Sequence, residues 1–213
     1  MPIFGYHKKN PTMPVAFHGS SVLFDRFDLS HVTEGDGKIK FGYGVYLTER
    51  YGTAAHYAFN KHRPEIDTFY VYTVEVPELN SDNSIYFDPK LPVPADVVAR
   101  VEKGLGEKLP VYATRLAKEL RRYLSNRLSG RNLTPKQMIS ADVKDIVGET
   151  AAAMFLQSIG YIAYRWPVNW TRPDEMQFAL FDENDARIIR VEKVELDGKH
   201  QLVEGSQTLV MEF

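Results

Sequence analysis

The feature that most constrains the fold is a helical segment, 89–159, set between two stretches of short β-strand patterns. Prolines introduce the helices of this segment, and Gly160 follows it as a typical helix end. Four leucines recur at every fourth residue, the spacing of one helix face: Leu116, Leu120, Leu124 and Leu128. The chain is therefore predicted to interrupt a β-rich domain with helices.

Runs of β-branched and aromatic residues predict the strands on either side. Before the helical segment they lie at 15–17 and 68–76, and a helix is predicted at 48–60 with Thr48 or Thr53 as its cap. After it they lie at 161–165, 177–181 and 187–196, followed by a hairpin that pairs 201–203 with 208–211. We expect one α+β domain over 1–213, with a helical insert at about 89–159.

Composition fits an intracellular protein with one hydrophobic core. The chain has 213 residues, 44% of them hydrophobic and 25% charged, which are ordinary values for a globular domain. It has no cysteine, which excludes disulfides and thiolate metal sites. No apolar run is long enough to span a bilayer, and the first residues lack the apolar core of a signal peptide. We therefore expect a cytoplasmic protein.

Charge is distributed unevenly along the chain. Between Arg100 and Lys136 there are ten basic and three acidic residues, although the whole chain has a formal net charge of −2. Such a segment can attract a polyanion, or it can be an ordinary solvated helix surface. The candidate acceptor-binding residues are Arg115, Arg121, Arg122 and Arg127.

Three short stretches carry the functional signal: 17–21 with the sequence Phe-His-Gly-Ser-Ser, 42–48, and 54–58. Gly42 and Gly44 form a GxG pair, but no third glycine follows and no long buried strand precedes it, so a Rossmann site is not indicated. A histidine, glycines and two spaced tyrosines suit the capture of a flat, amide-bearing aromatic ring attached to a ribose, as at the nicotinamide end of NAD.

These stretches resemble the first two motifs of ADP-ribosyltransferases of the diphtheria-toxin and poly-ADP-ribose-polymerase type, as found also in phage and mobile-element polyvalent proteins. The resemblance implies a split β-sandwich with a helical insert. It implies that His18 holds a ribose hydroxyl, that the Gly19 backbone binds the carboxamide, and that Tyr46 and Tyr57 enclose the nicotinamide ring. Ser20 is either a ligand contact or a turn residue, and Gly44 allows close backbone approach. The alternative interpretation is that His18 is a satisfied histidine at a strand end and that Tyr46 and Tyr57 are core aromatics.

The third motif departs from the family pattern. The family carries a glutamate at the position that corresponds to Gln177, where its charge stabilises the oxocarbenium ion formed as nicotinamide leaves. Glu175 lies two residues earlier, so on a strand it shares the face of Gln177. Three alternatives follow: Glu175 supplies the charge after a register shift, Glu175 deprotonates the acceptor while Gln177 orients the ribose, or the protein is a weak enzyme or a pure NAD binder. Asp174 is a lesser candidate.

The resemblance thus implies an NAD-dependent mono-ADP-ribosyltransferase, with NAD as co-substrate and a protein side chain or a nucleic acid as acceptor. Such a chain resembles toxins and phage-defence effectors, for which an antitoxin or inhibitor is a possible partner. A catalytically silent NAD- or ADP-ribose-binding module is the alternative, and a nucleic-acid-binding domain that never meets NAD is a third. No metal is expected, because the spacing of His56 and His62 does not suit a shared helix face.

Overall fold

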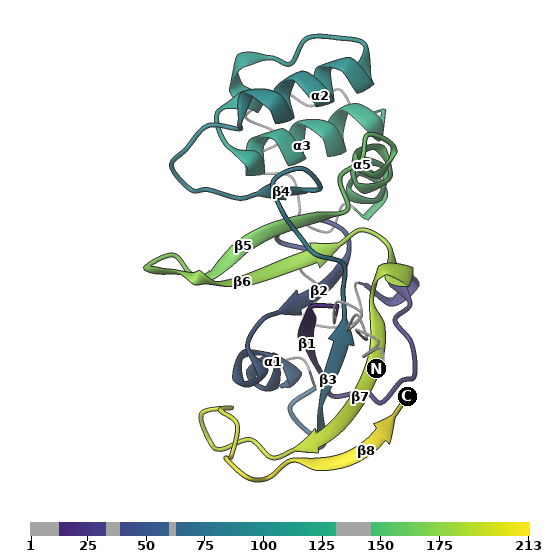
Figure 1. Ribbon diagram of the computed structural model, residues 1–213, viewed down its shortest axis with the longest axis vertical. Helices are drawn as coiled ribbons and strands as arrows, with labels where there is room; N and C mark the ends of the chain where they lie inside the picture. Colours follow the sequence, from purple (N-terminus) through teal and green to yellow (C-terminus); the bar gives the residue numbers. More distant parts are fainter. Residues whose placement is uncertain (1–12, 33–38, 60–62, 131–145) are drawn as a thin grey trace, which may run out of the picture.

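The computed structural model describes residues 13–32, 39–59, 63–130 and 146–213 as an α+β fold built on one eight-stranded sheet. The strand order is β4-β5-β6-β2-β1-β3-β7-β8 (Figure 1). The strands are β1 (Val15–Ser20), β2 (Val45–Thr48), β3 (Phe69–Glu75), β4 (Ser84–Tyr86), β5 (Ala163–Asn169), β6 (Arg172–Leu180), β7 (Arg187–Val194) and β8 (Thr208–Glu212). The predicted α+β class is confirmed.

The sheet has two halves that meet between β1 and β2. Strands β1 and β2 are paired at a single position, where Phe17 lies opposite Thr48. By contrast, all six residues of β1 pair with β3. The β1 and β2 backbones therefore diverge beyond Phe17, and the half that contains β4, β5, β6 and β2 is held to the rest by a narrow junction. All neighbouring strands are antiparallel except β4 and β5.

The helices fall into two groups, as Figure 1 shows. Helix α1 (Tyr51–Ala58) lies against β1 and β3. The helices α2 (Ala95–Leu105), α3 (Ala117–Leu128) and α5 (Ile146–Ser158) gather at the other end of the molecule, next to β4 and β5. Helices α2, α3 and α5 fall within the segment 89–159 that was predicted as a helical insert; part of its last predicted helix, 142–145, lies outside the described residues.

Three apolar clusters hold these layers together. The largest joins α2, α3 and α5 to one face of β5 and β6, with Leu120, Leu124 and Leu156 almost fully buried. The second fills the opposite face of the sheet around Tyr72, Val191 and Leu180. The third is small: three alanines of α1 pack on Val71, where larger side chains would not allow the helix to lie so close. Helix α1 thereby stays fixed beside β1.

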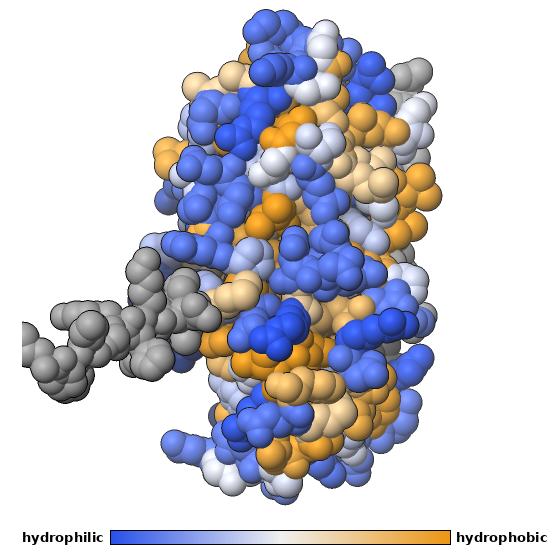
Figure 2. Space-filling view, turned by 45° about the vertical axis from the view of Figure 1, so that its right-hand side comes forward, coloured by the Kyte–Doolittle hydropathy of each residue, from blue (hydrophilic) through white to orange (hydrophobic). Residues whose placement is uncertain are grey.

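The C-terminal hairpin prediction is wrong. Strand β8 pairs with β7 rather than with 201–203, and Leu202 forms an isolated bridge with Leu196 instead. The long strand β7 offers β8 a ladder of several residues, which three residues at 201–203 do not. Figure 2 shows apolar residues gathered on the lower part of the face where β8 lies, and Leu209, Val210 and Phe213 are exposed there.

The predicted threonine cap of α1 is also wrong. Arg50 is the N-cap and makes no capping hydrogen bond with its side chain. Thr48 still contributes one residue earlier, because its Oγ1 accepts a 3.3 Å hydrogen bond from the Arg50 backbone N–H. The side chain of Arg50 is directed to β6 instead, as described below.

Candidate functional site

The three motifs of the sequence come together on neighbouring strands. The first motif, with His18, lies on β1; the second, with Tyr46, lies on β2; and the third, with Gln177, lies on β6. In the sheet β2 lies between β1 and β6. Thr48 lies opposite Phe17 of β1 and also opposite Gln177 of β6. Residues directly opposite one another share a face of the sheet, so Phe17, Thr48 and Gln177 project to one side, while His18 alternates with Phe17 along β1 and projects to the other. Segments about 160 residues apart in sequence thus meet at the junction of the two halves.

His18 lies at the gap where β1 and β2 part. Its Nδ1 lies 2.8 Å from the Tyr46 carbonyl oxygen, and a carbonyl only accepts, so Nδ1 carries the hydrogen. In the neutral ring Nε2 is then an acceptor, as is needed to hold a hydroxyl. Burial lowers the pKa of His18, because desolvation disfavours the imidazolium and outweighs the hydrogen bond to Tyr46. His18 is therefore neutral at pH 7.

The surroundings of the His18 ring are aromatic. Phe27 meets it edge-on with ring centroids 5.3 Å apart, and Phe24 and Tyr72 lie 6.0 Å away. The interpretation of His18 as a satisfied core histidine is thus supported in part: three of its neighbours belong to the packing of the sheet face. The residue as a whole is half-buried.

Gly19 and Gly44 both lie where a side chain would collide with backbone. A Cβ at Gly19 would overlap the carbonyl oxygen of Ala54 in α1. A Cβ at Gly44, where φ is +150°, would overlap the carbonyl of Leu180. Gly19 is therefore required for helix packing, whatever its backbone binds. Ser20 acts as a turn residue here, since its Oγ accepts a 3.0 Å hydrogen bond from the Val22 N–H.

Gly19→Ala is expected to lower the free energy of unfolding by about 3 kcal/mol, because α1 must move away from β1 to admit the methyl group. Urea denaturation of both proteins measures the difference. Gly52→Ala is the matched control: Gly52 lies in the same helix with nothing within 4 Å of a built Cβ, so this change should be neutral or stabilising by about 0.5–1 kcal/mol. Equal effects of the two variants would contradict the packing argument.

Tyr46 and Tyr57 occupy different environments. The Tyr46 hydroxyl donates to the Gly42 carbonyl at 2.8 Å and accepts from the Phe41 N–H at 3.0 Å, and its ring lies 5.5 Å from that of Trp166. Burial raises the pKa of Tyr46, so this hydroxyl stays protonated. Tyr57 is 61% exposed and meets only the edge of His56 among the described rings. The predicted enclosure of a ligand ring by these two tyrosines stays a prediction.

Gln177 presents donors to its surroundings. It is buried, and Trp166 Nε1, which can only donate, lies 2.6 Å from its Oε1. One acceptor site of the amide oxygen is therefore occupied, and the NH2 group points elsewhere. A carboxylate at this position would accept a hydroxyl hydrogen and attract a developing cation, whereas the amide NH2 does neither.

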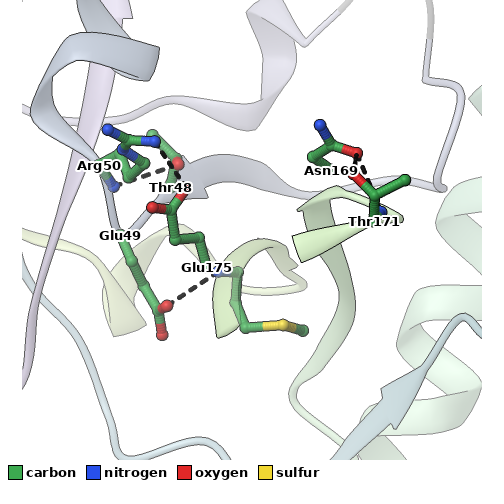
Figure 3. A network of polar contacts seen from close by, with 7 residues as sticks. Thr48, Glu49, Arg50, Asn169, Thr171 and Glu175 are labelled. Atoms are coloured by element: carbon green, nitrogen blue, oxygen red, sulfur yellow. Dashed lines mark hydrogen bonds and ion pairs between the residues drawn. The ribbon is translucent and has the colours of Figure 1, made fainter. Parts of the chain in front are cut away.

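Glu175 supplies a carboxylate on the same strand. Its Oε2 accepts a 2.8 Å hydrogen bond from Arg50 Nη1, and its side chain is 28% exposed. Figure 3 shows Arg50 and Glu175 directed toward one another across β2 and β6, with Thr48 beside them. Glu49, which lies between Thr48 and Arg50 in the sequence, accepts a 2.8 Å hydrogen bond from the backbone N–H of Met176. Asp174, the lesser candidate, is exposed.

The basic segment is less available than its sequence suggests. Arg121 is buried, with 4% of its side chain exposed, and pairs with Glu149 at 2.5 Å, so its expected role in acceptor binding is wrong. Arg127 is exposed but pairs with Glu107, which also bonds Tyr123. Arg115 is exposed and Arg122 half-buried, so these two remain candidates, as does Arg127, whose pair with Glu107 is exposed. Spacing on a helix does not show which arginine points inward.

Two residues of this site were missed by sequence reasoning. Arg50 had no motif to mark it. Trp166 lies opposite Gln177 only because the register of β5 against β6 shifts between Pro167 and Asn169; regular counting from the turn would place Trp166 opposite Glu175. That count requires the strand bounds, which the sequence gives only to within a few residues.

Among the described residues, no group of three or more potential metal ligands lies close enough to hold an ion. No described helix combines the length and apolar character that a membrane span requires. Comparison of the chain with family models, curated proteins and solved structures finds no match.

Proposed function

We propose that this protein is an NAD-dependent mono-ADP-ribosyltransferase. The observation that carries the proposal is the meeting of the three motifs at the β1–β2–β6 junction, where His18 is bonded to the backbone of Tyr46 and Gln177 lies beside Thr48. Nothing in the spacing of these residues along the chain requires them to be neighbours. The proposal includes the split β-sandwich fold. The narrow junction between the two halves of the sheet supports this part of the proposal.

The reaction breaks the bond between the nicotinamide nitrogen and ribose C1′, and nicotinamide leaves with the bonding electron pair. A nucleophile of the acceptor then forms a bond to C1′ and loses a proton. In this scheme His18 Nε2 accepts a hydrogen bond from a ribose hydroxyl. Glu175 is the carboxylate that stabilises the positive charge at C1′ or takes the acceptor's proton, since Gln177 has no charge and its oxygen already accepts from Trp166.

For this role the Glu175 carboxylate must give up its ion pair with Arg50 and contact the substrate instead. The pair is partly exposed, so the energy that it contributes is small. A substrate can therefore displace Arg50 at little cost. Arg115, Arg122 and Arg127 are the remaining residues through which a nucleic-acid acceptor would be attracted, with the salt dependence typical of phosphate contacts. A cytoplasmic toxin or phage-defence role with an inhibitor partner belongs to the same proposal.

A second candidate is an NAD- or ADP-ribose-binding module without transferase activity. The hydrogen bond from Trp166 to Gln177 favours it, because the position that carries the family's glutamate here holds an uncharged amide whose oxygen already accepts from Trp166. Such a module would still bind the ribose and the carboxamide of NAD, but it would not break the bond between the nicotinamide nitrogen and ribose C1′.

The deciding experiment measures nicotinamide release from NAD by the full chain, with and without RNA, DNA or cell extract. The transferase predicts release that falls at least about tenfold in His18→Ala and also falls in Tyr46→Ala. His31→Ala, a substitution of an exposed histidine, serves as the matched control. Binding of NAD without release supports the module, and neither binding nor release would overturn both.

A further inference from the structure

A cavity of about 210 Å³ lies on the face of the sheet opposite Gln177. Its floor is formed by Met176 and Phe178, which alternate with Gln177 along β6 and therefore project to the other side. Arg165 of β5 is directly opposite Phe178 and lines the same floor. The segment 76–79, which follows β3, covers the cavity, and Glu49 borders it. This cavity is separate from the site proposed above.

Arg165 brings a half-buried guanidinium to this mainly apolar cavity. Its Nε is buried and no acceptor lies within hydrogen-bond distance among the residues that the structure describes. Burial lowers the pKa of the Arg165 guanidinium, and the negative charge of Glu49 partly opposes that shift. A buried donor without a partner costs about 1–3 kcal/mol, so an acceptor placed here would be bound favourably.

Two carboxylates stand on the exposed side of the cavity. Glu49 and Glu78 both line it and both are exposed. Glu49 is held by the Met176 N–H, and within the described part of the chain no ion pair joins it to Arg165. The cavity thus has a cation within, acidic groups toward solvent, and apolar walls that include Leu79 and Val76.

We infer that this cavity binds a small zwitterion with an apolar side chain, that is, a free apolar amino acid. The carboxylate would accept hydrogen bonds from Arg165, the ammonium group would face Glu49 and Glu78, and the side chain would lie against Phe178 and Leu79. The volume is below the range of about 300–1,000 Å³ typical of drug-sized ligands, which fits a molecule of this size. A simple anion would be repelled by the two glutamates, and a simple cation by Arg165.

The test titrates the full chain with L-phenylalanine and L-leucine and follows amide signals by ¹H–¹⁵N NMR. Saturable shifts at the cavity residues are expected. Two ligands that each lack one charge of phenylalanine, 3-phenylpropionate and phenethylamine, should bind at least about tenfold more weakly. No saturable shift with either amino acid, or equal affinity for the charge-deleted ligands, would overturn the inference.

Variants separate the charges of the cavity. Arg165→Met is expected to weaken binding at least about tenfold, and Glu49→Gln to weaken it for the amino acids but not for 3-phenylpropionate. Arg187→Met, which removes an exposed arginine of β7, is the control that should bind as the native chain does. Should Arg165→Met fail to fold, the Glu49→Gln result still decides: unchanged selectivity between phenylalanine and 3-phenylpropionate would contradict the proposed orientation.

Discussion

Glu149→Leu is expected to lower the free energy of unfolding by about 3–5 kcal/mol, the largest effect on stability that we predict. Glu149 lies in α5 and pairs with Arg121 of α3, and both side chains are less than 8% exposed. Removal of the carboxylate strands a buried guanidinium whose Nε already has no hydrogen-bond partner within the described residues. Urea denaturation followed by circular dichroism measures the change.

The double variant Arg121→Met/Glu149→Leu is the control for this prediction. With both charges replaced by apolar groups of similar size, no buried ion remains unpaired, and the stability should return to within about 1–2 kcal/mol of the native chain. A double variant as unstable as Glu149→Leu alone would show that the loss comes from packing rather than from a stranded charge.

This buried pair also supports the candidate site. A Cβ built on Gly42 would lie 2.7 Å from the Tyr164 ring and 3.2 Å from Arg121 Cδ, so the turn that carries Gly42 rests on both side chains. The Gly42 carbonyl in turn accepts the hydrogen bond from the Tyr46 hydroxyl. The helical insert therefore contacts the site through Arg121, which explains why this arginine lies inside the protein rather than on an acceptor-binding surface.

Glu175→Gln is expected to reduce nicotinamide release by about a hundredfold or more while leaving the affinity for NAD nearly unchanged. Loss of a preorganised charge at a developing cation commonly costs this much. The amide keeps the size of the side chain and its place beside Arg50, so the variant tests charge rather than packing. Steady-state release assays, combined with calorimetric NAD binding, separate the two effects.

Three companion variants make this prediction specific. Asp174→Asn removes the neighbouring exposed carboxylate from the opposite face of β6 and should have little effect. Gln177→Ala should be no more damaging than Glu175→Ala. If Gln177→Glu raised the rate while Glu175→Ala did nothing, the assignment of the charge to Glu175 would be wrong, and the family's usual position would be the functional one.

Local patterns predicted most of the secondary structure. The aromatic and β-branched run at 68–76 is β3 (Phe69–Glu75), since such residues suit a half-buried pleated surface. The leucines four apart lie in α3 (Ala117–Leu128) or flank it, because their spacing follows the helical repeat. The prediction of a C-terminal hairpin was wrong. Whether β8 pairs with β7 or with 201–203 depends on which partner offers the longer ladder of hydrogen bonds, and local patterns do not contain this information.

The side-chain contacts of the candidate site could not be predicted from these local sequence patterns. The sequence places Gln177 where the enzymes that its motifs resemble have glutamate, but the hydrogen bond that its oxygen accepts from Trp166 depends on the register of β5 against β6. Likewise, Glu175 is visible as an acid, while its pairing with Arg50 requires β2 and β6 to be neighbours. A hydrogen bond is set by distances of a few tenths of an ångström, which no one-dimensional spacing contains.

The sequence by itself determined the α+β class, the helical interruption and the residue types of the three motifs, because these follow from short-range periodicity and chemistry. Only the tertiary structure decided that β1, β2 and β6 lie side by side, that Arg121 points inward to Glu149, and that Arg165 lines a cavity, its Nε having no hydrogen-bond partner among the described residues. The physical reason is that strand order and burial arise from packing among distant segments, where the total apolar area removed from water, not any local preference, selects the arrangement.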